Sequence, residues 1–327
     1  MEEKIDILLA TYNGEKYLKE QIDSILNQTY KNIRIIISDD CSTDKTREIL
    51  QEYEKKDERI SVYYQKQNLG CVKNFDFLLQ KVENKLYMLS DQDDIWLPEK
   101  IEKSVKTLEK ENADLVFCDL EIVDEELKTI NSSFCKSMKL DKKIKKCISS
   151  YKMQYLYNCI TGCTILSKKE YIKDILPIPT KSKHIIHDHW IGLVVLLKNG
   201  KVAFLDESCI KYRQHRENQV GVKKKSYGYD KIEDVRNLFI EVKEGIFETY
   251  IENNEKFPEK LQELNKQALK YFKSLRNKKY INFRNWNIFH KLYCNESFTY
   301  YIQNFIILNI PIVAKMFFKI GKKYLNS

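Results

Sequence analysis

The sequence lacks the short motifs that mark several protein classes. Its nine cysteines form no Cys-x-x-Cys pair, and their number is odd, so we interpret them as reduced, structural cysteines. The first residues, MEEKIDILLATYNG, contain neither a basic segment nor an apolar core, so we expect no secretory signal. Both absences favour a cytoplasmic protein.

Two glycine-rich phosphate-binding motifs are also missing. The chain contains no G-x-G-x-x-G and no G-x-x-x-x-G-K-[ST]. A dinucleotide-binding function and a P-loop function therefore lose their main support.

Acidic residues are scarce near the C-terminal end. Residues 1–222 contain 36 basic and 36 acidic residues, residues 223–327 contain 20 and 11, and residues 264–327 contain 12 basic residues against Glu296 alone. The apolar segment after Phe298 is interrupted by polar residues and Pro311, which poorly fits a membrane-spanning helix. We expect it to lie on an anionic membrane surface, or else to pack as a core helix or a dimer surface.

Alternating β-rich and helical patterns run from Ile5 to about Asp119. With 327 residues and 43% hydrophobic content, this order predicts an α/β fold with a mostly parallel, doubly wound sheet. The lysine-rich stretch from Lys136 to Lys146 has little periodicity and is expected to be a loop. From about residue 223 the pattern is helical. We therefore predict a large α/β domain over residues 1–222 and a basic helical extension over residues 223–327.

Polar clusters follow three of the predicted strands: TYNGE, SDDCSTD and SDQDD. Ligands bind at the carboxyl ends of such strands, so the clusters should converge. In the last cluster Asp91 and Asp93 would share a face and suit Mg²⁺ or Mn²⁺, with Asp94 turned aside to begin a loop. The alternative is that the segment only caps a helix.

The four segments TYNGEKYLKEQIDSILNQTY, IIISDDCSTDKT, NLGCVKNF and LSDQDDIWLPEK occur in one order and spacing, followed by TGCT, HDHW and YRQHRENQVG. Together, over about residues 4–221, they resemble an inverting family 2 glycosyltransferase with the GT-A fold. They are most similar to bacterial rhamnosyltransferases that assemble cell-surface polysaccharides.

This resemblance implies roles for residues in the donor half, about 1–119. The nucleotide pocket would be lined by Thr11, Tyr12, Asn13 and Glu15, with Asp39 or Asp40 on the base. Asp91 would face the ribose and the cation, and Asp93 would be the main ligand of Mn²⁺ or Mg²⁺. Simple capping is the alternative for the aspartates after the second strand, and it fits Asp44 best.

The acceptor half, about 120–222, would supply the catalytic base. Asp188 in HDHW would take this role, or would merely cap the following helix. His187 stands where the family usually has glutamate, and protonated His187 or His189 would lower the pKa of Asp188.

Further roles are implied with alternatives. His215 would be a third cation ligand or a structural histidine. Arg213 would hold the diphosphate or pair with a carboxylate. Gly162 would allow close approach of the sugar or mark a bulge, and Trp96 and Trp190 would form the acceptor floor or belong to the core.

The resemblance implies a metal-dependent transfer of a sugar, L-rhamnose from dTDP-rhamnose, to a lipid-linked or polysaccharide acceptor at the inner face of the cell membrane. The alternatives are a transferase that uses a UDP-hexose, a nucleotidyltransferase, and a non-enzymatic basic adaptor for membrane or nucleic acid. We expect no nucleic-acid partner, and the sequence does not indicate an oligomeric state.

Overall fold

A computed structural model describes residues 2–138, 140–182, 184–215, 218, 232–276, 286–294 and 298–309. The chain divides into two compact units. The first comprises residues 1–180 and 186–222, and the second comprises residues 181–185 and 223–327.

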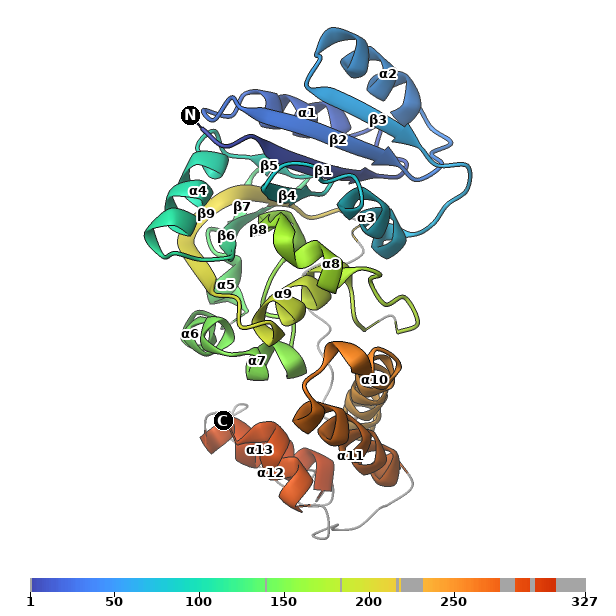
Figure 1. The fold of residues 1–327 in the computed structure, drawn as a ribbon, viewed down its shortest axis with the longest axis vertical. Helices are drawn as coiled ribbons and strands as arrows, with labels where there is room; N and C mark the ends of the chain where they lie inside the picture. Colours follow the sequence, from blue (N-terminus) through green and yellow to red (C-terminus); the bar gives the residue numbers. More distant parts are fainter. Residues whose placement is uncertain are drawn as a thin grey trace, which may run out of the picture. The chain divides into compact units, whose positions relative to one another are not determined.

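The N-terminal part of the first unit is a parallel sheet in the order β3-β2-β1-β4 (Figure 1). Its strands are β1 (Ile5–Thr11), β2 (Ile33–Asp39), β3 (Ile60–Tyr64) and β4 (Leu86–Ser90). The central strands are buried along almost their whole length, as expected for a sheet covered on both faces, which explains their continuous apolar runs.

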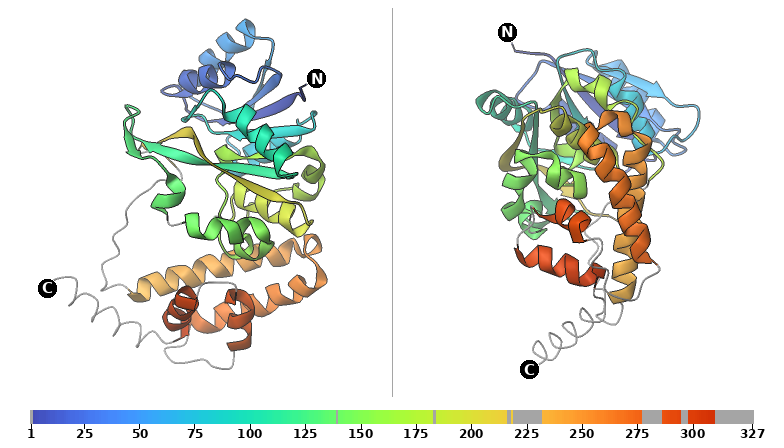
Figure 2. Two further views of the ribbon diagram at one scale, coloured as in Figure 1. Left: turned by 90° about the vertical axis from the view of Figure 1, so that its left-hand side faces the viewer. Right: turned by 60° about the horizontal axis from the view of Figure 1, so that its bottom comes forward.

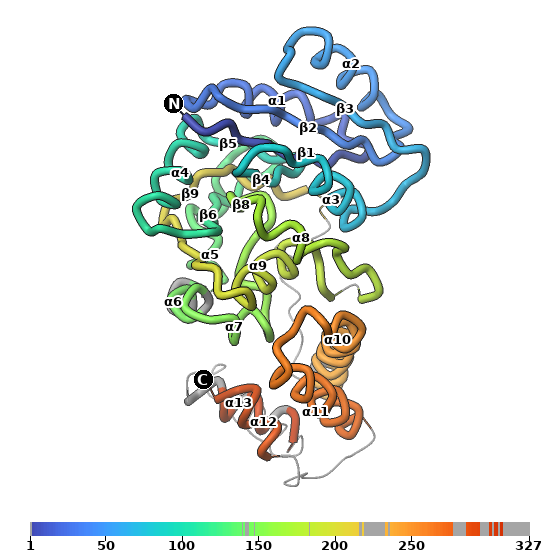
Figure 3. The backbone as a smooth tube through the Cα atoms, in the orientation of Figure 1, coloured from blue at the N-terminus to red at the C-terminus, as the bar shows by residue number. Residues whose placement is uncertain are grey.

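Three helices connect these strands, namely α1 (Leu18–Leu26), α2 (Thr46–Lys56) and α3 (Cys71–Leu79). In Figure 1, α1 and α2 lie on one side of the strands and α3 on the other, the arrangement that right-handed crossovers produce for this strand order. Thr11 pairs with Asp39 and Leu9 with Ser90. The ends of β1, β2 and β4 therefore meet at one edge, and the chain can be followed through them in Figure 3.

The rest of the sheet is mixed. The short strand β8 (Leu166–Lys168) pairs antiparallel with β4 and with β6 (Leu115–Val123), and β9 (Val202–Arg213) runs parallel to β6. β5 (Ile95–Trp96) and β7 (Thr129–Asn131) add antiparallel edges. The predicted α/β class is confirmed, but the sheet is mixed rather than mostly parallel.

The remaining helices of this unit are α4 (Lys100–Lys110), α5 (Phe134–Ser137), α6 (Asp141–Ser149), α7 (Tyr151–Leu156), α8 (Ile172–Ile175) and α9 (His187–Leu197). The predicted loop over Lys136–Lys146 is wrong, because most of it lies in α5 and α6. Ile144 and Ile148 are four residues apart and form the apolar face of α6, with Ile144 buried. The many lysines of this segment hide that spacing.

Cysteine chemistry differs from the expectation at one position. Cys159 takes part in a disulfide, so the prediction that all cysteines are reduced is wrong for this residue. Reduced thiols are present at Cys41, Cys71, Cys118, Cys135, Cys163, Cys209 and Cys294.

The second unit is helical, with α10 (Ile232–Glu252), α11 (Glu259–Arg276), α12 (Trp286–Tyr293) and α13 (Phe298–Asn309). Figure 2 shows α10 and α11 side by side, with the rings of Phe247 and Phe272 stacked 5.7 Å apart. Within the described residues, none of the helices has the length and apolarity needed to cross a membrane. The basic end with Lys319, Lys322 and Lys323, on which the membrane-surface prediction rests, lies outside the described residues.

Candidate active site

The loops that follow β1 and β2 are joined by side chains. Asn13 Oδ1 accepts a hydrogen bond from the Thr43 amide at 2.9 Å, and Glu15 Oε2 accepts one from the Lys45 amide at 2.9 Å. In return, Asp44 accepts from the Glu15 amide at 3.0 Å. Asn13 and Glu15 are both predicted to contact the nucleotide. Their side-chain oxygens accept hydrogen bonds from backbone amides and shape this edge of the sheet.

The two aspartates at the end of β2 face different partners. Asp39 is 0% exposed and accepts from Arg47 Nε at 2.7 Å. Asp40 is 2% exposed and accepts from the Leu69 and Gly70 amides at 2.6 and 2.8 Å. Burial, followed by the charges of several aspartates including Asp40, raises the pKa of the Cys71 thiol. Both residues predicted for the nucleotide base are therefore buried, and their carboxylate oxygens accept hydrogen bonds from within the protein.

The start of the first loop has one exposed aromatic side chain. Tyr12 is 44% exposed, whereas Thr11 is buried and donates to Gln92 Oε1 at 2.6 Å. The tyrosine ring is therefore accessible for stacking, while the threonine hydroxyl is already bound within the protein.

The cluster after β4 brings several carboxylates together. Asp93 Oδ2 lies 2.8 Å from His215 Nε2, which β9 places beside it although the two residues are 122 positions apart. Burial, followed by the charges of Asp93 and Asp188, raises the pKa of Asp91 to about 7. Asp91 therefore lies within electrostatic range of the proposed base.

Asp94 is more than the turn-forming residue that the sequence predicts. It is fully buried, and its Oδ2 has no hydrogen-bond partner among the described residues. One ligand atom each of Asp91, Asp94 and Cys163 lie within 4.8 Å of one another. Burial and the two neighbouring carboxylates raise the pKa of Asp94, because like charges in a low-dielectric site oppose ionisation.

These residues fit a divalent cation. Carboxylate oxygens suit Mg²⁺ and Mn²⁺, and the neutral imidazole of a histidine suits Mn²⁺. Asp91 and Asp93 would supply the oxygens and His215 the nitrogen, and Asp94 adds a buried oxygen that has no hydrogen-bond partner among the described residues.

Arg213 does not have a free guanidinium. It is 2% exposed, donates from Nε to the Asp93 carbonyl at 3.1 Å and from NH1 to the Glu125 carbonyl at 2.7 Å, and pairs through NH2 with Glu20. The sequence offered diphosphate binding or ion pairing, and the structure shows ion pairing. Arg213 therefore anchors the backbone of the aspartate loop.

Asp188 lies in the first turn of α9, and its carboxylate accepts three hydrogen bonds. Oδ1 accepts from Asn158 Nδ2 at 2.8 Å and from the His189 amide at 2.6 Å, and Oδ2 accepts from the Gly162 amide at 3.0 Å. Burial raises its pKa to about 6 despite these bonds. Each carboxylate oxygen has two acceptor positions, so Oδ2 keeps one available for a proton.

His187 does not supply the positive charge that would lower the pKa of Asp188. Burial lowers the pKa of His187 to about 3, so this ring is neutral and supplies no positive charge. It stacks on Phe75 with centroids 4.1 Å apart, and a side chain at Gly162 would come within 2.6 Å of His187 Nε2. Gly162 lies in a 3₁₀ turn, Gly162–Thr164, where its missing side chain makes room for the imidazole.

Neither tryptophan is placed to form an acceptor floor. Trp96 is 2% exposed and Trp190 is 0% exposed. Trp190 Nε1 donates to the Ile175 carbonyl at 2.9 Å, and Lys100 Nζ lies 3.1 Å from the Trp96 ring centroid. A sugar needs an accessible ring face, so the acceptor-floor prediction is corrected and both residues belong to the core.

Sequence reasoning missed three residues around this site. Asn158 orients Asp188, Gln92 binds the loop after β1, and the buried Lys100 lies near Asp94. Burial lowers the pKa of Lys100 to about 8. The sequence held a signal for Gln92 alone: alternate residues of an extended segment point to opposite faces, so the middle residue of D-Q-D faces away from the two aspartates.

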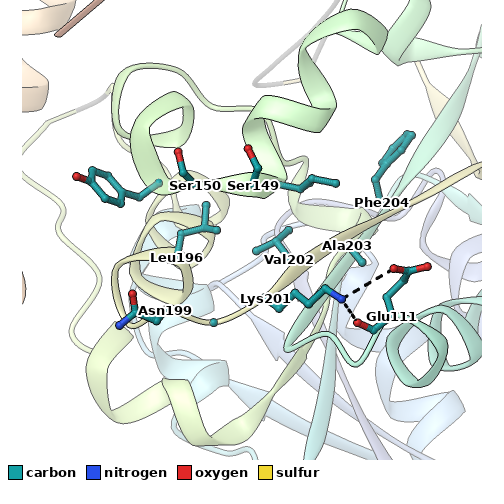
Figure 4. Close-up of a pocket in the computed structure, with 12 residues that line it drawn as sticks. Glu111, Ser149, Ser150, Leu196, Asn199, Lys201, Val202, Ala203 and Phe204 are labelled. Carbon is teal, nitrogen blue, oxygen red and sulfur yellow. Dashed lines mark hydrogen bonds and ion pairs between the residues drawn. The ribbon is translucent and has the colours of Figure 1, made fainter. Parts of the chain in front are cut away.

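A cavity of about 770 Å³ lies elsewhere in this unit. It is lined by the end of α6, the start of α7 and β9, including Ser149, Ser150, Tyr151 and Lys201 (Figure 4). Lys201 is turned to Glu111 there. Neither Asp188 nor any of the aspartates that follow β2 and β4 lines this cavity.

Comparison with known proteins gives a family and a fold. A family model described as Glycosyl transferase family 2 matches residues 6–174. An uncharacterized glycosyltransferase, RT0329 of Rickettsia typhi, is 34% identical over 215 residues, which is 64% of either chain. The dTDP-rhamnosyl transferase RfbG of Shigella flexneri is 30% identical over 65% of this chain and 73% of its own.

Solved structures share the fold at low identity. TarS 1-349 of S. aureus in complex with UDP-GlcNAc has a TM-score of 0.55 at 17% identity and covers 93% of this chain and 81% of its own. The mannosyltransferase PcManGT of Pyrobaculum calidifontis, in complex with GDP-Man and Mn²⁺, has a TM-score of 0.53 at 12% identity and covers 100% and 89%.

Proposed function

Because the chain belongs to glycosyl transferase family 2, we propose that it transfers a sugar with inversion from a nucleotide diphosphate donor to a glycan acceptor in bacterial surface polysaccharide synthesis, with help from a divalent cation. The proposed donor is dTDP-L-rhamnose and the proposed acceptor is lipid-linked. The rhamnosyl donor is supported by the likeness to RfbG.

The donor would bind where the ends of β1, β2 and β4 meet. Tyr12 offers an exposed ring to the base, and Asp40 orders the edge of this site through the Leu69 and Gly70 amides. The loop that carries Asn13 and Glu15 is held by the loop after β2, so the wall of the nucleotide pocket is ordered before the donor arrives.

Asp91, Asp93 and His215 would hold Mn²⁺ or Mg²⁺ at the donor diphosphate. When bound, the cation neutralises negative charge that develops on the leaving diphosphate. Arg213 keeps the Asp93 backbone in place through its hydrogen bond to that carbonyl, and Asp94 adds a buried carboxyl group whose Oδ2 has no hydrogen-bond partner among the described residues.

Asp188 carries the proposal, because it is a buried carboxylate that is oriented by three donors and keeps one acceptor position on Oδ2. In the transfer, an acceptor hydroxyl attacks the anomeric carbon from the face opposite the diphosphate, and Asp188 Oδ2 takes the hydroxyl proton. A pKa of about 6 keeps the carboxylate ionised at neutral pH and still makes it a better base than an exposed aspartate.

The donor is testable without knowing the acceptor. Thermal unfolding of the wild-type protein with a panel of nucleotide sugars, each with and without Mn²⁺, reports binding because a ligand that prefers the folded state raises the melting temperature. We expect the largest rise with dTDP-L-rhamnose and Mn²⁺. A larger rise with a UDP-hexose would overturn the proposal of a rhamnosyl donor. A UDP-sugar donor is the second candidate, supported by the UDP-GlcNAc complex of TarS.

The reaction type is tested by the released product. The proposed transfer releases a nucleoside diphosphate, whereas a nucleotidyltransferase would release pyrophosphate from a nucleoside triphosphate. Incubation of the protein with dTDP-L-rhamnose and Mn²⁺, with water as a slow acceptor, should yield dTDP. Pyrophosphate release from dTTP, without dTDP from the sugar nucleotide, would overturn the proposal.

A further inference from the structure

The middle residue of the D-Q-D segment is bound to the loop that follows β1. Gln92 Oε1 accepts from Thr11 Oγ1 at 2.6 Å and from the Tyr12 amide at 2.8 Å, and Gln92 Nε2 donates to the Tyr12 carbonyl at 3.0 Å. One side-chain amide thus pairs with both backbone groups of Tyr12, in the way a neighbouring strand would.

The first loop is shaped to admit this side chain. A side chain at Gly14 would come within 2.4 Å of Gln92 Oε1 and 2.8 Å of Gln92 Cδ, distances that real atoms do not adopt. Any residue larger than glycine at position 14 would therefore push Gln92 out. The glycine of the TYNGE segment accommodates the amide as well as forming a turn.

The neighbours of Gln92 in the chain are Asp91 and Asp93. Three hydrogen bonds hold the Gln92 side chain, and peptide bonds join Gln92 to both aspartates. The position of Tyr12 and the positions of both carboxylates are therefore linked. Polar constellations work only when their members are held within about 0.5 Å of the productive geometry by locked rotamers.

We propose that Gln92 is a positioning residue that makes nucleotide binding and cation binding cooperative. The inference rests on the proposed function, since it takes the loop with Tyr12 as the nucleotide wall and Asp91 and Asp93 as cation ligands. Through its hydrogen bonds, the side-chain amide of Gln92 couples the position of the loop after β1 to the position of the loop after β4. Because coupling is reciprocal, the nucleotide then raises cation affinity by the same factor by which the cation raises nucleotide affinity.

Calorimetric titration of dTDP, with and without Mn²⁺, measures this factor in the wild-type protein and in Gln92→Leu. Leucine is similar in size but makes none of the three hydrogen bonds. We expect the factor by which Mn²⁺ raises dTDP affinity to fall roughly 5- to 20-fold in the variant, a range typical of coupling between sites. Gln80→Leu is the matched control, because Gln80 is exposed and its amide reaches only Asp76; its coupling factor should match the wild type.

The two proposals fail in different ways. Wild-type protein that binds dTDP equally with and without Mn²⁺ would overturn the cation part of the proposed function together with the role of Gln92. Wild-type protein with strong coupling, and Gln92→Leu with the same coupling, would overturn the role of Gln92 alone. Should Gln92→Leu melt below the assay temperature, Gln92→Asn keeps an amide one methylene too short to reach Tyr12 and gives the same test.

Discussion

The ends of β2 and β4 both carry adjacent carboxylates, and the structure uses them in opposite ways. At the end of β2, Asp39 and Asp40 are both buried and their oxygens are bound by Arg47 and by backbone amides. At the end of β4, Asp94 has a buried oxygen without a partner among the described residues, and the pKa of Asp91 is raised to about 7.

The difference separates carboxylates that build loops from carboxylates left for a ligand. A buried carboxylate that accepts amide hydrogens stabilises the loop whose amides it binds. A cluster of like charges with an unpartnered buried oxygen costs free energy in the folded state. Such a cluster is expected where a cation completes it.

The largest expected effect is at Asp188, which tests whether a fully oriented carboxylate also does chemistry. Asp188→Ala should lower the rate of sugar transfer by about 10²–10⁴-fold, the usual contribution of a general base, and leave donor affinity unchanged. Rates of nucleoside diphosphate release and donor titrations measure the two quantities. An equal loss of donor affinity would move Asp188 from the base to the donor pocket.

The second largest effect is expected at the end of β4, where the carboxylates are proposed to bind a cation. Asp93→Asn should weaken Mn²⁺-dependent donor binding by at least about 10-fold, as loss of a metal ligand does, without lowering the melting temperature, since it removes one of several like charges. Titration with the donor and a melting curve on the same sample check both parts. A destabilised variant with normal donor affinity would put Asp93 among the loop-building carboxylates.

The converse is expected at β2. Asp40→Ala should lower the free energy of unfolding by about 1–3 kcal/mol, because it leaves the Leu69 amide unpaired, whereas the Gly70 amide keeps its second acceptor, Asn68 Oδ1. Urea denaturation measures the change, with Asp93→Asn as the matched control from the other strand end. If both variants were equally stable, the distinction between the two strand ends would be wrong.

The smallest effect is the pH dependence of the transfer rate of the wild-type protein. Asp188 must be ionised to accept a proton, so the transfer rate should fall about tenfold per pH unit below its pKa of about 6. The pKa of the folded state lies above the ordinary value, so between about pH 6 and pH 4 the folded state binds this proton more tightly and gains stability as the pH falls. Melting curves over this range separate lost catalysis from unfolding, and a flat rate profile would contradict the assignment of Asp188.

Several features of the site were predictable and others were not. The convergence of the loops after β1, β2 and β4 follows from parallel strands, and the residues involved stand next to those strands in the chain. Trp96 and Trp190 were open between core and acceptor floor, because ring exposure depends on what packs above each ring. The helix α6 was missed because its lysines mask the spacing of Ile144 and Ile148.

The sequence by itself determined the fold class and family of this protein, since strand periodicity and motif order are local properties of the chain. Only the tertiary structure decided which polar side chains of the site are already bound, because their partners are distant in the chain: His215 for Asp93, Asn158 for Asp188 and Thr11 for Gln92. The same folding step buries Asp91, Asp94 and Asp188 and raises their pKa values. Desolvation depends on what surrounds a group in space, and that is set when the chain folds.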